Sequence, residues 1–255
     1  MPIAAEIYYH LYAESEGGLR LPVVLIHGAG GIHLHWPPEI RRMPGYRVFA
    51  LDLPGHGKSG GRGYQSISAY AQVVLEWLGV IGVHRAVFIG HSMGSAIAIN
   101  LALDHSTHVM GLVLIGGGAR LRVAPAFLDG ASSPTTFHRT VEMIVSWSFS
   151  EKTPVRLVEL AAQRMDETRP SVLHGDFLAC DSFDEMERIA QIRKPTLVLC
   201  GNEDRMTPLR YSQFLANNIP DAVLKSIPDA GHMVMLEQPQ AVTKALMDFL
   251  SGISF

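Results

Sequence analysis

The chain is poor in cysteine, with only Cys180 and Cys200 among 255 residues. Cys200 ends a predicted buried strand, and Cys180 lies in a different region of the sequence. Two such cysteines do not make the disulfide framework of a small secreted protein. The sequence therefore predicts a protein of a reducing compartment, the cytoplasm.

Long apolar runs and clusters of positive charge are also missing. No apolar run reaches the length that crosses a membrane. Residues 1–14 lack the basic and apolar regions of a secretory signal and alternate like a strand instead. The net charge is −3 with no basic run, which argues against a nucleic-acid partner. These absences leave a soluble globular protein.

The order of strand-like and helix-like segments predicts the fold class. Hydrophobic residues make up 47% of the chain and charged residues 18%, which suits one large domain with a buried sheet. The alternation of strands and helices favours a doubly wound, mostly parallel α/β sheet. The predicted strands are residues 6–13, 21–26, 47–51, 86–89, 109–115, 196–200 and 223–227. The predicted helices are residues 66–78, with Ser66 as a possible cap, 95–103, 208–217 and 240–250.

One stretch, about residues 120–188, breaks this alternation. It lies between two predicted strands and shows helical patterns at 135–148, 154–165 and 171–179. We interpret residues 119–189 as a helical cap inserted into a core of residues 1–118 and 190–255. Pocket walls are largely apolar, so we expect about one in three of the large apolar cap residues to face a substrate. These residues are Phe127, Phe137, Met143, Ile144, Trp147, Leu157, Met165 and Phe177.

The segment Gly90-His91-Ser92-Met93-Gly94 follows an apolar strand-like run and precedes a helix-like stretch. A strand that runs straight into a helix forces a sharp turn, and the residue at its tip takes a strained backbone conformation. The flanking glycines keep side chains out of this turn and leave Ser92 Oγ exposed above the sheet edge. This context indicates a nucleophilic serine. The alternative is a simple N-cap of the following helix.

An acid and a histidine follow Ser92 in the chain. Where a nucleophilic serine lies in such a turn between a strand and a helix, the catalytic residues come in the order Ser, then Asp or Glu, then His. Asp204 lies in the loop after one predicted strand, and His232 lies in the loop after the next. The carboxyl ends of parallel strands meet at one rim of the sheet, so we expect the three side chains to lie together. Glu203 is the rival acid. His91 is the rival histidine, which we expect to pack and to point away from the serine.

Five segments in one order carry a family resemblance. They are His27-Gly28-Ala29-Gly30-Gly31, Asp52-Leu53-Pro54-Gly55-His56-Gly57-Lys58-Ser59, the serine segment, Gly201-x-x-Asp204 and Gly231-His232. Together they span residues 27–232, nearly the whole chain. With these segments the chain resembles the α/β-hydrolase fold superfamily, in its branch of serine esterases, haloperoxidases and C–C hydrolases. The resemblance implies the α/β-hydrolase fold.

A serine hydrolase of this kind needs two backbone N–H groups that bind the oxyanion. The N–H of Met93, directly after the nucleophile, is the first. By resemblance the second belongs to Ala29, with Gly30 as the next choice. The glycines of this loop let the backbone approach a substrate closely. The resemblance also implies that His27 and His56 are structural.

These residues predict a carboxylic-ester hydrolase for small to medium, fairly apolar esters. His232 would take the proton of Ser92, Asp204 would hold the imidazole, and an acyl-enzyme would form on the serine. The same triad serves lactone hydrolysis, perhydrolysis and C–C cleavage of ring-fission products. Some members of the superfamily are ligand receptors with slow turnover.

C–C cleavage usually needs polar groups that hold the carboxylate of a dienoate substrate. The candidates in and near the predicted cap are Arg120, Arg122, His138 and Arg164. A solvated surface is the more common place for each of these side chains.

Two patterns that mimic cofactor sites are incomplete. His33 and His35 form a close histidine pair without a further ligand at zinc-site spacing. The loop from Gly28 follows a strand like a dinucleotide fingerprint, but His33 occupies the position of its last glycine. We therefore interpret Asp52, at the end of the next strand, as a loop anchor and not as a ribose ligand. The sequence predicts no metal and no cofactor, and a small-molecule ester as the partner.

Overall fold

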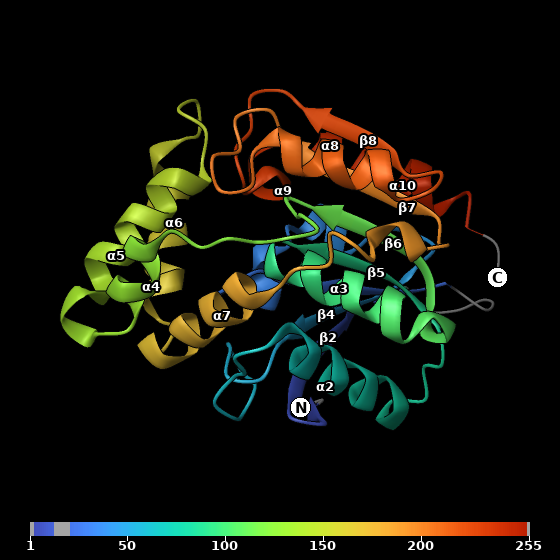
Figure 1. The fold of residues 1–255 in the computed structure, drawn as a ribbon, viewed down its shortest axis with the longest axis horizontal. Helices are drawn as coiled ribbons and strands as arrows, with labels where there is room; N and C mark the ends of the chain where they lie inside the picture. Colours follow the sequence, from blue (N-terminus) through green and yellow to red (C-terminus); the bar gives the residue numbers. More distant parts are fainter. Residues whose placement is uncertain (1–2, 13–20, 254–255) are drawn as a thin grey trace.

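The computed structural model describes residues 3–12 and 21–253. Its centre is a sheet in the order β1-β2-β4-β3-β5-β6-β7-β8 (Figure 1). The pairs β1–β2 and β2–β4 are antiparallel, and all other pairs are parallel. The predicted mostly parallel α/β sheet is therefore confirmed. Residues 1–2 and 13–14 of the predicted amino-terminal segment, and residues 254–255 of the predicted core, lie outside the described residues.

All the predicted strands are present, and the first of them, β2, pairs with β4 and with the additional short strand β1. Strands β5 and β6 are buried along their whole length, which explains why their sequences are continuous apolar runs and not alternating ones. The strands are β1 (Ile3–Ala4), β2 (Ile7–Tyr12), β3 (Pro22–Ile26), β4 (Arg47–Asp52), β5 (Ala86–His91), β6 (Val109–Ile115), β7 (Thr196–Gly201) and β8 (Val223–Ile227).

Helices cover both faces of the sheet. The predicted cap of α2 is confirmed, because the Ser66 side chain accepts a 3.2 Å hydrogen bond from the N–H of Ala69. One face of the sheet is covered by α2 (Ile67–Val80), α3 (Met93–Asp104) and α8 (Leu209–Asn218). The opposite face is covered by α1 (Pro38–Arg41) and α10 (Pro239–Leu250). The short elements α9 (Val234–Glu237), η1 (His33–His35), η2 (Ser106–His108) and η3 (Ile189–Gln191) connect them.

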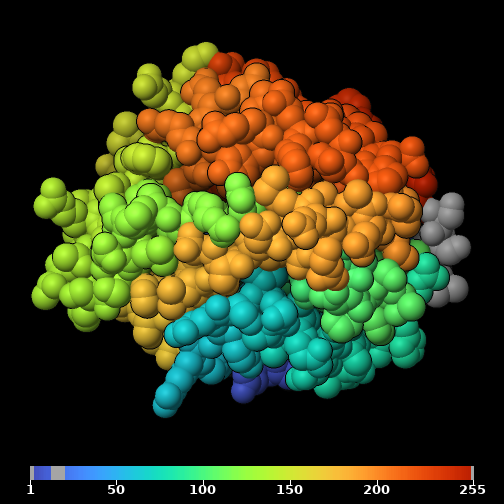
Figure 2. All heavy atoms as spheres, in the orientation of Figure 1, coloured from blue at the N-terminus to red at the C-terminus, as the bar shows by residue number. Residues whose placement is uncertain are grey.

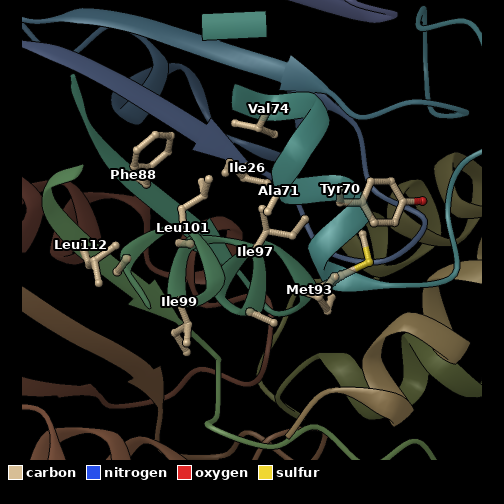
Figure 3. Packing of buried hydrophobic residues seen from close by; sticks show 14 of the residues in the cluster. Ile26, Tyr70, Ala71, Val74, Phe88, Met93, Ile97, Ile99, Leu101 and Leu112 are labelled. Atoms are coloured by element: carbon tan, nitrogen blue, oxygen red, sulfur yellow. The ribbon is translucent and has the colours of Figure 1, made fainter. Parts of the chain in front are cut away.

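The core that positions the serine segment is built around α3, which packs against β5 and α2. Figure 3 shows Ile97 and Leu101 of α3 beside Ala71 of α2 and Phe88 of β5, all of them buried. Almost every residue of α3 is buried. The helix that follows Ser92 is therefore fixed on several sides, and so is the turn that leads into it.

Four helices lie between β6 and β7, and we call them the inserted helices. They are α4 (Pro125–Ala131), α5 (Pro134–Ser148), α6 (Val155–Asp166) and α7 (Pro170–Ser182). They stand at one end of the sheet, and α7 runs back toward the core (Figure 1). Figure 2 shows them as lime and yellow atoms on one side of the molecule. The sequence predicted α5, α6 and α7 but not the short α4.

The two ends of this insertion are fastened to each other. The N–H of Glu185 donates to the carbonyl of Ala119 at 2.7 Å. Arg120 and Asp184 form an isolated antiparallel bridge beside it. The segment between Ala119 and Glu185 thus begins and ends at one place.

Both cysteines are buried free thiols. Burial raises the pKa of each thiol above its ordinary value. Within residues 3–12 and 21–253, no helix combines the length and the apolar character needed to cross a membrane.

Candidate active site

Ser92 occupies the turn between β5 and α3, in a strained backbone conformation with φ 53° and ψ −115°. Such a left-handed φ is costly for a residue other than glycine, and it persists only where the surroundings enforce it. The N–H of Ser92 is held by the carbonyl of Ile115 in β6 at 2.8 Å. The Ser92 side chain makes no capping hydrogen bond to α3. The structure therefore does not support the simple helix-cap interpretation.

The glycines on either side of Ser92 make this turn possible. A Cβ atom on Gly90 would lie 2.1 Å from the carbonyl oxygen of Gly94. A Cβ atom on Gly94 would lie 2.2 Å from the carbonyl oxygen of Ile26 in β3. Both contacts are with backbone, which cannot move aside without shifting β3 or α3.

We expect Gly94→Ala to lower the free energy of unfolding by about 3 kcal/mol or more, because its methyl group overpacks the turn. The matched control is Gly79→Ala, since Gly79 lies in α2 with nothing within 4 Å of its Cβ position. This control should raise stability by up to about 1 kcal/mol through helix propensity alone. Urea unfolding measures both. Equal stability of the two variants would contradict the close approach of Gly94 to β3.

Asp204 and His232 are brought together by the loops after β7 and β8. Asp204 Oδ2 lies 2.9 Å from His232 Nδ1. The other carboxylate oxygen accepts the N–H groups of Met206 at 2.9 Å and Thr207 at 2.8 Å. The rival acid Glu203 lines a separate surface hollow. The acid that contacts the histidine is thus the one that the sequence favoured.

The surroundings of Asp204 keep it ionised. Burial on its own raises the pKa of this carboxyl, but the attraction of His232 and the hydrogen bonds from His232 and Thr207 outweigh burial and lower it. A carboxylate accepts but does not donate hydrogen bonds. The hydrogen on Nδ1 of His232 is therefore donated in a hydrogen bond to Asp204, and the lone pair of Nε2 can accept a proton.

Thr207 completes this pair, and sequence analysis missed it. Its Oγ1 lies 3.0 Å from Asp204 Oδ2, 3.2 Å from His232 Nδ1 and 2.8 Å from the carbonyl oxygen of Gly116. Gly116 has φ 54°, and a Cβ atom there would lie 3.1 Å from His232 Nδ1. A glycine at the end of β6 therefore leaves room for the imidazole. The position of Thr207, three residues after the acid, was the available signal.

We expected His91 to pack and to point away from Ser92. It is buried, as expected, but its ring lines one cavity with Ser92 and His232, with its centroid 4.7 Å from that of the His232 ring. Burial lowers the pKa of His91 well below its ordinary value, so the ring is neutral at pH 7. Its Nε2 donates to the carbonyl of His232 at 3.0 Å. His91 thereby holds the backbone of the other histidine.

Two cavities reach Ser92. The smaller, of about 50 Å³, is lined by Ser92, His232 and His35 among others. The larger, of about 140 Å³, opens beside it under the inserted helices. More of the predicted apolar residues face these cavities than the expected one in three. They are Phe127, Ile144, Trp147, Met165 and Phe177.

The loop after β3 offers one amide to the cavity and uses the next one internally. Ala29 lines both cavities. The N–H of Gly30 donates to Asp176 Oδ2 at 2.9 Å, so it is occupied. Neither the N–H of Ala29 nor that of Met93 donates to any group in the described part of the chain. Of the two predicted choices in this loop, only Ala29 has a free amide.

Asp52 anchors two loops, as predicted. Its Oδ1 accepts from the N–H of His33 at 2.6 Å and lies 2.8 Å from His33 Nδ1. Its Oδ2 accepts from the N–H of Lys58 at 2.9 Å. Among the residues that the structure describes, no group of three or more potential ligands is arranged for a metal ion. His33 is thus paired with Asp52, while His35 faces the smaller cavity.

Of the four basic candidates near the insertion, Arg122 alone lines the larger cavity. Its side chain is about half exposed, at 49%, and its guanidinium lies 3.3 Å from the carboxylate of Asp184. Arg205, which sequence analysis missed, lines the same cavity and donates to the carbonyl of Ser146 at 2.6 Å. The remaining candidates pair with acids on the surface, namely Arg120 with Asp184, His138 with Asp166 and Arg164 with Glu167.

A family model described as the alpha/beta hydrolase family matches residues 23–245. The chain belongs to this family. A pimeloyl-(acyl-carrier protein) methyl ester esterase of Yersinia enterocolitica is 26% identical over 96% of this chain and 97% of its own. A 2-hydroxy-6-oxo-6-phenylhexa-2,4-dienoate hydrolase of Burkholderia cepacia is 25% identical over 93% and 90%.

A solved structure of a thermophilic esterase is also similar to this α/β hydrolase. It shares 32% identity and a TM-score of 0.81, and the match covers 97% of this chain and 100% of the other. These likenesses support a hydrolase activity of the α/β-hydrolase type. The names of the relatives differ in the bond that is cleaved.

Proposed function

We propose that this α/β hydrolase is a carboxylic-ester hydrolase with the triad Ser92, His232 and Asp204. The observation that carries the proposal is the Asp204–His232 pair beside a cavity that also contains the strained Ser92. A serine hydroxyl is a weak nucleophile unless a base removes its proton. His232 has a free Nε2 for this role, because Nδ1 is held by the carboxylate.

The reaction would proceed through an acyl-enzyme. Ser92 Oγ attacks the ester carbonyl carbon while its proton passes to His232 Nε2. The C–O bond to the alcohol then breaks, and the alkoxide takes that proton. Water attacks the acyl-serine with His232 as base again, which releases the acid. The N–H groups of Ala29 and Met93 would stabilise the oxyanion in both halves of the reaction.

The inserted helices would act as the cap that selects the substrate. Phe127, Trp147 and Phe177 give the larger cavity an apolar wall, and its volume of about 140 Å³ suits a small to medium acyl or alcohol group. We propose residues 119–189 as this cap, with the rest of the chain as the core. We also propose a cytoplasmic location, since both cysteines are free thiols.

C–C hydrolysis of ring-fission products is the second candidate. Arg122 favours it, because this side chain lines the cavity of Ser92 and a guanidinium suits the carboxylate of a dienoate. A slowly turning ligand receptor with the same triad is a third. It would release one equivalent of product in a burst and then stop.

The test is steady-state hydrolysis of p-nitrophenyl acetate, butyrate, hexanoate and octanoate, with mass spectrometry of the quenched enzyme. An esterase gives sustained turnover and an acyl adduct on the peptide that contains Ser92. Absence of ester turnover would overturn the proposal. A ring-fission dienoate then tests the second candidate, and a single burst identifies the third.

A further inference from the structure

Gly30, the residue after Ala29, is held by the inserted helices on several sides. Its N–H donates to Asp176 Oδ2 in α7 at 2.9 Å. Its carbonyl accepts from Thr168 Oγ1, between α6 and α7, at 3.2 Å. A Cβ atom on Gly30 would lie 2.9 Å from Leu173 Cδ1, also in α7. A loop of the core is thus fastened to residues more than a hundred positions later in the chain.

The carboxylate that binds Gly30 is fully buried and has three donors. Besides the Gly30 amide, Asp176 Oδ2 lies 2.8 Å from His56 Nε2, and Oδ1 accepts from the Tyr70 hydroxyl at 2.6 Å. Burial on its own lowers the pKa of His56, but the attraction of Asp176 outweighs it and raises the pKa. Buried ion pairs contribute little net stability. Stability alone therefore does not explain why this carboxylate is buried here.

The bonds fix the three peptide planes that orient the Ala29 amide. The carbonyl of Gly28 accepts from the Gly31 N–H at 3.0 Å and lies 2.8 Å from His27 Nδ1. In a trans peptide the N–H points opposite the carbonyl, so the Ala29 N–H points away from these donors. Asp176 fixes the next plane, between Ala29 and Gly30.

Thr168 fixes the third plane, between Gly30 and Gly31. Its hydroxyl holds the carbonyl side, and the carbonyl of Gly28 holds the N–H side. Without Asp176 the middle plane would lose its one bond from outside the loop, since the Ala29 carbonyl accepts no hydrogen bond within the described residues. That plane is the central peptide of the turn that the Gly31 N–H closes onto the Gly28 carbonyl. Its rotation would strain this closing bond, loosen the Gly28–Ala29 plane and so displace the Ala29 N–H from a developing oxyanion.

We propose that Asp176 and Thr168 are positioning residues that preorganise the oxyanion site through Gly30. The inference rests on the proposed esterase function. It assigns to the inserted helices a part of the catalytic rate in addition to substrate selection. Oxyanion stabilisation acts on the transition state and not on substrate binding, so loosening this loop should lower kcat and leave KM nearly unchanged.

The test compares Asp176→Ala, Asp176→Asn and Thr168→Val with Tyr70→Phe as the matched control. Tyr70→Phe removes a donor from the same carboxylate but leaves the oxygen that binds Gly30 untouched. We expect kcat for p-nitrophenyl butyrate to fall about 10- to 100-fold in Asp176→Ala and somewhat less in Thr168→Val, with KM within about threefold. Asp176→Asn keeps an acceptor oxygen and should recover part of the loss. Tyr70→Phe should keep kcat within about threefold while its Tm falls.

Phenylboronic acid gives a second measurement. It forms a B–O bond with Ser92 Oγ, the serine proton passes to His232, and the tetrahedral adduct places an oxygen at the oxyanion site. Its Kd should rise in proportion to the loss of kcat. If Asp176→Ala does not fold, Thr168→Val decides.

Two failures are distinguishable. A parent enzyme that hydrolyses no ester contradicts the proposed function itself. An active parent whose Asp176 and Thr168 variants keep kcat and boronate affinity, or lose them only as much as Tyr70→Phe, contradicts the positioning role alone.

Discussion

Replacing Ser92 with alanine should lower kcat/KM for p-nitrophenyl esters by about 1,000-fold or more. The change removes the oxygen on which the proposed acyl-enzyme would form, and the proposed oxyanion donors and the binding contacts would supply only residual catalysis. The backbone of this turn is held by the N–H of Ser92 and by the close approach of Gly90 and Gly94. The alanine variant should therefore fold like the parent.

Steady-state kinetics and labelling by a fluorophosphonate measure this loss in parallel. The matched control is Ser146→Ala, because Ser146 is exposed at the end of α5 and, within the described residues, its hydroxyl bonds only the carbonyl of Met143. Parent and control should both be labelled and both turn over ester. Retained turnover in Ser92→Ala would show that another group forms the covalent bond.

Asp204→Asn should lower kcat by about 1,000- to 10,000-fold with little change in KM. The asparagine keeps the shape of the side chain but loses the charge that stabilises the imidazolium. If the side-chain NH2 group of the asparagine faces His232 Nδ1, it donates to that nitrogen and favours the tautomer with the proton on Nε2. An Nε2 that carries a proton cannot accept the proton of Ser92. The N–H groups of Met206 and Thr207 would hold the amide oxygen at the position of Oδ1 and so favour that arrangement.

The neighbouring Glu203→Gln is the matched control, since it removes one negative charge from the same loop. Glu203 lines a hollow on the surface and forms no hydrogen bond or ion pair with His232 in the described structure. Its kcat should stay within about threefold of the parent. A loss in Glu203→Gln as large as that in Asp204→Asn would overturn the assignment of the acid.

The sequence predicted the sheet well because its signals are local. Continuous apolar runs such as β5 and β6 are typical of strands buried on both faces, and both lie where they were predicted. The helix α4 was missed since it has only seven residues and contains Gly130, a weak helix former. The short α1 and α9 have four residues each and show no clear helical period.

Around the serine, the sequence predicted some contacts and missed those that depend on distant parts of the chain. Asp204 and His232 follow strand ends in a fixed order, so chain order alone predicted their meeting. Asp176 lies within a helix, 146 residues from the glycine that it holds, and only the folded chain brings the two together. The direction of the His91 side chain likewise depends on the loop that carries His232.

The fastened ends of the insertion have a consequence for exchange between relatives. Because Ala119 and Glu185 meet at one place, the segment between them can be replaced by one of another length without moving β6 or β7. A chimaera built in this way would keep its sheet. The transplanted segment would also have to carry an acceptor for the Gly30 amide at the position of Asp176. A segment that fits the cavity but lacks this acceptor should yield a folded enzyme with a low kcat.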